Sequence, residues 1–323
     1  MHRRFAAVLA SFALAAGASA QAPQKLAFLT NWFAQAEHGG FYQAIAEGIY
    51  LRHGLDVTVR MGGPQVNGLQ LLLAGQADLF MGYDIQVLLA RAADLPLVTV
   101  GATFQKDPVV LIAHPDVKRI EELKGRPIYI SSASHTTFWP WLAARYGFAD
   151  DQKRPYSFSV QPFLADRRAA TQGYATSEPF VVEKAGVKPS VFLLADLGYP
   201  PYAQTVVATE AFLAKNGDAV KRFVRATAEG YRSYLANPAP ANALIRKANP
   251  EMTEDLLAFG VKTIRGYGLV AGGDAAKQGI LTMTDERWRQ TFDFMVRAGL
   301  LKPGVDWRKA YSLDYVRDAR ILP

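Results

Sequence analysis

The sequence predicts an α/β fold with two lobes and a helical C-terminal region. Between Leu26 and Thr209, short apolar strand patterns alternate with amphipathic helix patterns, which is typical of largely parallel sheets covered by helices. From Glu210 onwards, long helical patterns dominate. A chain of 323 residues is long enough for two domains with separate cores.

The first lobe begins with an apolar strand pattern at Leu26–Thr30. Phe41, Ile45 and Ile49 recur every four residues and predict a helix that ends near Gly54. We expect further strands in this lobe at residues 56–60, 79–82 and 97–103, and helices at residues 66–73 and 85–93.

The second lobe repeats this alternation. We expect strands at residues 109–113, 127–131, 157–161, 174–177 and 191–195, and helices at residues 120–125, from about Thr136 and from Asp166. After one more strand at Thr205–Thr209, the C-terminal region contains predicted helices at residues 211–236, 239–247, 253–265 and 286–298.

Residues 1–20 have the pattern of a secretory signal peptide. Arg3 and Arg4 precede the apolar run Phe5–Gly17, and an A-x-A motif at residues 18–20 predicts cleavage before Gln21. The apolar run is too short to span a bilayer. The chain contains no cysteine, which excludes disulfides, a thiol nucleophile and a lipid on a cleavage-site cysteine. We therefore expect a soluble mature protein in the periplasm, without a lipid anchor.

The chain is expected to pass between the lobes twice, near Gln105–Pro108 and near Tyr202–Val206. Lobe 1 would then consist of residues 21–107 and 205–323, and lobe 2 of residues 108–204. Two crossings form a hinge rather than a tether, and a cleft between two lobes is a usual place for a ligand.

The sequence contains no complete catalytic, metal or cofactor motif. The histidines form no H-x-x-x-H pair, and neither a G-x-S-x-G elbow nor a G-x-x-x-x-G-K-[ST] phosphate loop occurs. The formal net charge is +7, but the basic residues are dispersed and are not interleaved with aromatics as a nucleic-acid surface requires. We expect a protein that is not an enzyme and that binds no cofactor, metal or nucleic acid.

Three segments resemble a family of solute-binding proteins of ABC transporters. They are NWFAQAEHGGFYQAIAEGIYLRHGLDV (residues 31–57), LLLAGQADLFMGYDIQVLLARAADLPLVTVGA (71–102) and FLADRRAATQGYATSEPFVVEKAG (163–186). The family is that of the thiamine-pyrimidine-precursor synthase-like proteins, with sulfonate, taurine and nitrate binders as wider kin. The resemblance covers Leu26 to Thr209 and implies a type II periplasmic binding protein fold, in which two lobes close on a small molecule.

On lobe 1, the candidate ligand contacts follow predicted strands, at the carboxyl edge where α/β ligands bind. A flat indole at Trp32 offers a heteroaromatic ring a stacking surface, with ordinary core packing as the alternative. Asp84 is expected either to contact ligand or to cap the helix that follows. The candidates on this lobe are Trp32, Phe33, His38, Gly40, Tyr42, Tyr83 and Asp84.

On lobe 2, hydroxyls and backbone N–H groups at residues 131–138 are suited to a polar or anionic group. Glu178 precedes a proline, which favours an extended turn, and a carboxylate there would accept N–H donors of an amino or amidine group. A helix N-terminal acid is the alternative for Glu178. The candidates are Ser132, Ser134 and Glu178, with Tyr202 at the return crossing. Trp139 and Trp141 cannot both face the cleft, because residues two apart lie on different faces of a helix.

The resemblance implies an extracytoplasmic solute-binding protein of an ABC importer, which we expect to be a monomer. It would capture a small pyrimidine-like heteroaromatic and deliver it to a permease in the inner membrane. The alternatives are a binder of a sulfonate or another organic anion, using an arginine such as Arg167, and a ligand sensor for a membrane receptor. Glu178 and Asp84 argue against an anion, because buried carboxylates repel it. Related enzymes of thiamine-pyrimidine synthesis carry a cysteine-containing motif that this chain lacks.

Overall fold

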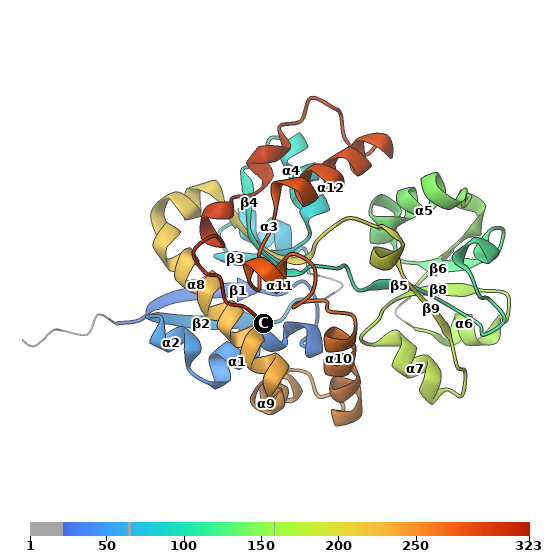
Figure 1. Ribbon diagram of the computed structural model, residues 1–323, viewed down its shortest axis with the longest axis horizontal. Coiled ribbons are helices and arrows are strands. Elements are labelled where there is room, and N and C mark those ends of the chain that lie inside the picture. Colours follow the sequence, from blue (N-terminus) through green and yellow to red (C-terminus); the bar gives the residue numbers. More distant parts are fainter. Residues whose placement is uncertain (1–21, 64–65, 158) are drawn as a thin grey trace, which may run out of the picture.

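The computed structural model describes residues 22–63, 66–157 and 159–323, so the predicted signal peptide lies outside the described residues. It contains two five-stranded sheets, which lie side by side in Figure 1. The strand orders are β2-β1-β3-β10-β4 and β7-β6-β8-β5-β9. We call the parts built on these two sheets lobe 1 and lobe 2.

The sheet of lobe 1 is largely parallel, as predicted, except that β10 runs antiparallel to both of its neighbours. Its strands are β1 (Gln24–Leu29), β2 (Leu55–Arg60), β3 (Leu79–Gly82), β4 (Leu97–Phe104) and β10 (Ala203–Thr209). Its first helices are α1 (Gly39–Ala46), α2 (Ile49–Arg52), α3 (Gly68–Leu73) and α4 (Asp84–Ala92).

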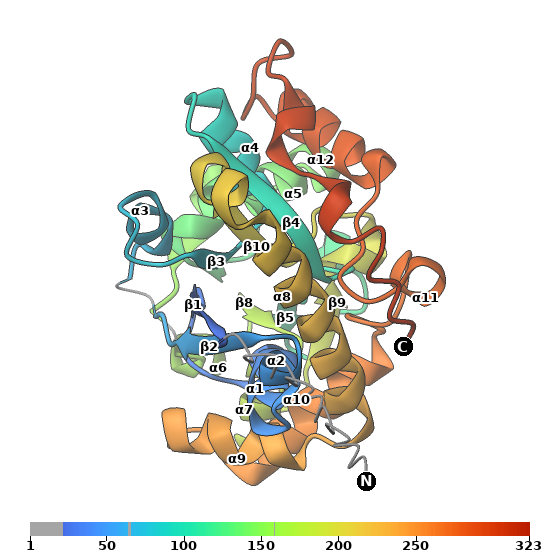
Figure 2. The same cartoon turned by 90° about the vertical axis from the view of Figure 1, so that its left-hand side faces the viewer.

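The predicted C-terminal helices are confirmed within a few residues. They are α8 (Glu210–Ala236), α9 (Ala239–Ala248), α10 (Glu254–Gly266) and α12 (Asp285–Arg297), with the short α11 (Ala275–Gln278) in addition. Figure 2 shows α8 running diagonally across lobe 1. All five return to lobe 1, so this lobe is much the larger of the two in Figure 1.

Helices cover both faces of the lobe 1 sheet. Neighbouring residues of a strand point to opposite faces, so Phe28 and Leu29 belong to different cores. Phe28 stacks on Phe41 of α1 at 4.3 Å and contacts Phe223 of α8 at 5.4 Å between ring centroids. Leu29 lies in the other core, with residues of α4 and with Trp288 of α12.

Two glycines let α8 approach the start of α1. A Cβ built on Gly40 would lie 2.1 Å from the ring of Tyr231, and one on Gly39 would lie 2.0 Å from the ring of Tyr234. Both tyrosines are fully buried in lobe 1. The structure therefore gives Gly40 a packing role in place of the predicted ligand contact.

Replacing Gly40 by alanine should lower the free energy of unfolding by about 1–3 kcal/mol, because the added methyl group overpacks the α1–α8 contact. Gly266, in the last turn of α10, is the matched control, since a Cβ there would meet nothing within 4 Å. Urea unfolding followed by circular dichroism measures both variants. Equal stabilities for the two would contradict this packing role.

Lobe 2 is built from a continuous stretch of the chain. Its strands are β5 (Val109–Ala113), β6 (Ile128–Ile130), β7 (Lys153–Pro155), β8 (Ala170–Tyr174) and β9 (Ser190–Leu193), and its helices are α5 (Phe138–Tyr146), α6 (Gln161–Ala165) and α7 (Glu178–Lys184). The predicted strand at 157–161, of which residue 158 is not described, is wrong in place, because β7 lies earlier and Gln161 already begins α6. The predicted helix from Asp166 is also wrong, since this carboxylate accepts the Arg168 N–H (2.9 Å) in a turn before β8.

The lobes are joined by two segments that we call the crossings, residues 105–108 and residues 198–202. The first leads from β4 to β5, and the second leads into β10. Ala203 pairs with Phe104, so the two crossings leave lobe 1 side by side.

Candidate ligand site between the lobes

The two sheets turn their carboxyl edges toward each other. In lobe 1, β1 and β3 end just before Thr30 and Tyr83, beside the start of the crossings. In lobe 2, Val109 follows the first crossing and pairs with Tyr174, so the end of β8 also lies beside the crossings. We call the residues at and after the carboxyl ends of β1, β3, β6, β7 and β8 the inter-lobe junction. They are Trp32, Phe33, Glu37, His38 and Tyr83 of lobe 1, and Ser131, Ser134, Tyr156, Gln172, Tyr174, Thr176 and Glu178 of lobe 2.

Direct contacts join the lobes at this junction. The hydroxyls of Tyr83 and Tyr174 form a hydrogen bond, and the Thr176 hydroxyl donates to the Glu37 carboxylate. Beside them, Phe180 of α7 packs against Phe259 of α10 at 5.3 Å between centroids. The lobes therefore lie closed against each other in this structure.

Glu37 is a buried carboxyl group of lobe 1, with 1% of its surface exposed. Burial raises its pKa from 4.5 to about 7, and the nearby Glu178 adds to this rise, while hydrogen bonds from Thr176 and from its own backbone oppose it. The carboxyl groups of Glu37 in lobe 1 and Glu178 in lobe 2 therefore lie close together.

Glu178 is the first residue of α7. One of its oxygens accepts from the Tyr156 hydroxyl (3.0 Å), and the other from the Tyr174 N–H (2.7 Å) and the Ser177 hydroxyl (2.5 Å). Glu178 is therefore an acid at a helix N-terminus, which was the alternative to a ligand contact. A carboxylate offers about four acceptor positions, so Glu178 can still accept one more donor.

Aromatic side chains supply the apolar part of the junction. Trp32 is half-buried, and Phe33, with 41% of its surface exposed, meets it edge to face at 5.6 Å. His38 is fully buried, and neither ring nitrogen has a hydrogen-bond partner among the described residues. Burial lowers the pKa of His38 to about 3, so the imidazole is neutral at physiological pH.

Three predicted ligand residues make contacts within the protein instead. Tyr42 is buried in the core of lobe 1. Asp84 is fully buried and accepts hydrogen bonds from the Ile85 N–H (2.7 Å), the Tyr202 N–H (2.8 Å) and the Thr291 hydroxyl (3.1 Å). Tyr202 is fully buried as well. The N-cap of α4 is Tyr83, so Asp84 anchors the second crossing rather than capping that helix.

The hydroxyl-rich segment of lobe 2 is bonded to its own sheet. The Ser134 hydroxyl and the Ser131 N–H both donate to the Gln172 side-chain oxygen, at 2.6 and 2.7 Å. The Ser132 side chain lies outside the described residues. Trp139 and Trp141 are both buried in lobe 2, so both indoles are packed within the protein in this structure.

Arg167 lies away from the junction. It lines a surface pocket of about 640 Å³ together with His114, Arg126 and Arg168. These residues flank the start of β8 and the end of β5, opposite to the strand ends at the junction. Within the described ranges, no cluster of three or more His, Cys, Asp or Glu side chains is placed to hold a metal, and no helix is long and apolar enough to cross a membrane.

Sequence reasoning missed five residues of the junction, namely Glu37, Tyr156, Gln172, Tyr174 and Thr176. The alternation of a strand could have indicated three of them. Gln172, Tyr174 and Thr176 are spaced by two and lead up to the predicted site residue Glu178, so a strand here would place them on the same face as Glu178. Glu37 carries no comparable pattern.

Residues 35–241 match the family described as NMT1/THI5 like. The chain belongs to the NMT1/THI5-like family. This NMT1/THI5-like chain is 27% identical to a riboflavin-binding protein, RibY, of Chloroflexus aurantiacus, over 91% of this chain and 86% of that one. It is also 27% identical to a formylaminopyrimidine-binding protein of Halalkalibacterium halodurans, over 68% of this chain and 69% of that one. Other relatives are named as synthases of a pyrimidine phosphate.

Solved structures agree with the fold of this family member. The periplasmic aliphatic sulphonate binding protein SsuA of Escherichia coli superposes with a TM-score of 0.68, over 89% of this chain and 91% of that one. At 18% identity, this likeness concerns the fold. The NMT1/THI5-like chain has the type II periplasmic binding protein fold, as the sequence predicted.

Proposed function

We propose that this protein is an extracytoplasmic solute-binding protein of an ABC importer and that it binds a small nitrogenous heteroaromatic between its lobes. The observation that carries the proposal is the inter-lobe junction, where Glu37 of lobe 1 lies near Glu178 of lobe 2 and Tyr83 of lobe 1 is hydrogen-bonded to Tyr174 of lobe 2. Relatives named for binding riboflavin and a formylaminopyrimidine support this ligand class.

The chemistry of the junction favours a ligand with N–H donors. Trp32 and Tyr83 offer ring faces for stacking, which contributes about 0.5–1.5 kcal/mol beyond area burial. Glu178 keeps one acceptor position, and the buried His38 has two nitrogens without a partner among the described residues. A ring with amino or amidine groups can donate to Glu178 and to the unprotonated nitrogen of the neutral His38, whose other nitrogen is an N–H donor.

In this proposal, the lobes are the moving bodies. Lobe 1 consists of residues 21–107 and 203–323, and lobe 2 of residues 108–202, because Ala203 already pairs with Phe104 in the lobe 1 sheet, and the hinge lies at the crossings. Ligand binding closes the lobes, and the closed form docks on a permease in the inner membrane. The protein acts as a monomer in the periplasm, without catalysis.

Substitutions at the junction test the ligand class. Trp32→Ala should weaken binding by about 1–3 kcal/mol, as expected for an aromatic anchor. Glu178→Gln should weaken it by about 2 kcal/mol, because a donor then faces a donor. Calorimetry with riboflavin, a formylaminopyrimidine and an alkanesulfonate measures these effects. Glu183→Gln, an exposed acid on the same helix, is the control.

The alternatives give different results in the same titrations. A sulfonate binder would bind the alkanesulfonate, and Glu178→Gln would leave that affinity equal or tighter, because the substitution removes a negative charge. A sensor would bind the same heteroaromatic but would be isolated with a receptor in a pull-down from membranes. Wild-type protein that binds neither riboflavin nor the formylaminopyrimidine would contradict the proposed ligand class.

A further inference from the structure

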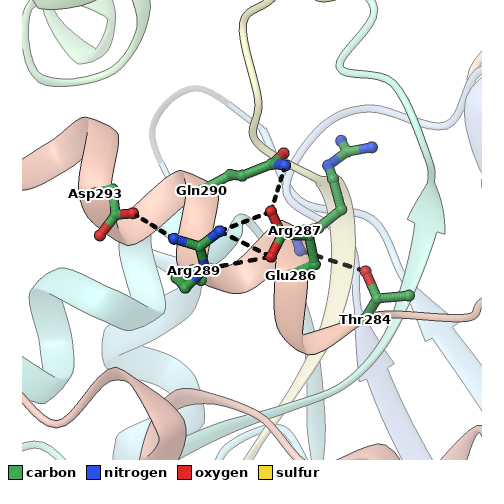
Figure 3. Close-up of polar contacts among 6 residues, drawn as sticks. All are labelled: Thr284, Glu286, Arg287, Arg289, Gln290 and Asp293. Atoms are coloured by element: carbon green, nitrogen blue, oxygen red, sulfur yellow. Dashed lines mark hydrogen bonds and ion pairs between the residues drawn. The ribbon is translucent and has the colours of Figure 1, made fainter.

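A single arginine of α12 contacts both crossings. Arg287 donates hydrogen bonds through Nη2 to the carbonyls of Gln105 (3.0 Å) and Pro200 (2.7 Å), and through Nε to Pro200 again (3.1 Å). Its guanidinium carbon lies 4.6 Å from the centre of the Tyr202 ring. Figure 3 shows the Arg287 side chain pointing away from the group formed by Glu286, Arg289, Gln290 and Asp293 on the same helix.

Further hydrogen bonds attach the crossings to this part of lobe 1. The Tyr202 hydroxyl accepts from the Thr284 N–H (3.1 Å), and the Gln105 side chain donates to the Thr282 carbonyl (2.9 Å). Asp84 accepts from the Tyr202 N–H and from Thr291 of α12. Each crossing is thus held at its lobe 1 end, and Arg287 is bonded to both.

The charge of Arg287 also suits this position. Two buried carboxyl groups lie at the crossings: Asp107 is part of the first, and Asp84 bonds the second through the Tyr202 N–H. Burial raises the pKa of Asp84 to about 6 and that of Asp107 to about 7, and the positive charge of Arg287 opposes the rise at Asp84. A cation here offsets part of the cost of burying negative charge at the hinge.

We propose that Arg287 is a positioning residue for ligand capture. By bonding both crossings it keeps them at a fixed spacing, so that lobe 2 moves as one body about a single axis. This inference rests on the proposed function in one respect, namely that the lobes open and close around a ligand. The planar guanidinium is suited to this role because its donors have a fixed geometry, whereas the ammonium of lysine is a point charge on a flexible stem.

Distance measurements between the lobes test the inference without a ligand. The chain has no cysteine, so Asp56→Cys on lobe 1 and Lys188→Cys on lobe 2, both exposed, can each carry a spin label. Electron–electron double resonance gives the distribution of inter-lobe distances in the full chain. The labelled protein is compared with Arg287→Lys, Arg287→Met and a matched control, Arg289→Met. Arg289 lies on the same helix and is half-exposed, and it pairs with Glu286 and Asp293.

We expect the distance distribution to broaden in both Arg287 variants and to stay unchanged in Arg289→Met. An unchanged distribution in folded Arg287→Lys, or equal broadening in Arg289→Met, would overturn the inference. Circular dichroism establishes that each variant is folded. If Arg287→Met is unfolded, Arg287→Lys, which keeps the charge and most of the length, decides the question.

Ligand titration separates this inference from the proposed function. With riboflavin or the formylaminopyrimidine, whichever the wild type binds, Arg287→Lys should bind about tenfold more weakly, because a smaller fraction of molecules adopts the closed arrangement. Unchanged affinity together with a broadened distribution would contradict the role in capture. If the wild type binds neither compound, the proposed ligand class fails, and the distance measurement still decides whether Arg287 holds the crossings.

Discussion

Replacing Asp84 by alanine is expected to lower the free energy of unfolding by about 4 kcal/mol. The carboxylate accepts three hydrogen bonds in a fully buried place, from Ile85, Tyr202 and Thr291. Alanine would leave two backbone N–H groups without acceptors, each at a cost of about 1–3 kcal/mol, in addition to the lost threonine contact. Urea unfolding followed by tryptophan fluorescence measures the change.

Asp293→Ala is the control for this experiment. Asp293 lies on α12 near Thr291, but it is only half-buried and forms a surface ion pair with Arg289 (3.3 Å). Such pairs contribute about 0–1 kcal/mol, so the control should unfold almost as the wild type does. A loss of less than 1 kcal/mol in Asp84→Ala would show that the second crossing does not depend on this carboxylate.

Glu37→Gln is expected to change how stability depends on pH. Burial raises the pKa of Glu37 from 4.5 to about 7, so between these values the folded chain binds a proton that the unfolded chain has released. The wild type therefore loses stability as the pH rises through this window, by about 3 kcal/mol from this group. Glutamine cannot ionise, so the variant should gain that amount relative to the wild type between pH 4 and pH 8.

The difference between the two proteins isolates Glu37 from other titrating groups. Asp84 and Asp107 also have raised pKa values and act with the same sign. His38 acts with the opposite sign, because its pKa is lowered to about 3 and its contribution is lost as the pH falls below 6.5. Glu183→Gln serves as the exposed control. Parallel stability curves for wild type and Glu37→Gln would contradict the rise in the pKa of Glu37 that burial causes.

The sequence allowed most of the fold to be predicted, because periodicity follows directly from burial. The apolar residues that recur at helical spacing in α8, and the alternating apolar residues at 56–60, are largely the residues that the structure buries. The predictions failed in lobe 2 between Lys153 and Ser177, where the strand expected at residues 174–177 also lies earlier, as β8 (Ala170–Tyr174). There the segments have only three to five residues, too few for a period to show, and a side-chain turn at Asp166 replaces a helix.

The site was less predictable than the fold, because contacts across the lobes leave no local pattern. Trp32, Tyr83 and Glu178 follow strand ends, and that position can be derived from the sequence. Glu37 meets Thr176 through tertiary packing, which no spacing encodes. Asp84 and Tyr202 have the residue types of a binding site, yet their hydrogen bonds are made to each other, to Ile85 of α4 and to Thr284 and Thr291 at α12.

Because β10 stands between β3 and β4, the sheet of lobe 1 stays incomplete until residues 203–209 have left the ribosome. Lobe 2 has all its strands in one earlier stretch and can complete its own sheet first. The core of lobe 1 also needs α8, since Phe28 packs on Phe223 and Gly40 on Tyr231. Pairings between residues so distant in sequence slow folding. β1, β2 and β3 can pair with one another early in synthesis, but β3 and β4 lack their shared partner β10 until lobe 2 has emerged, so the sheet of lobe 1 is completed later than that of lobe 2.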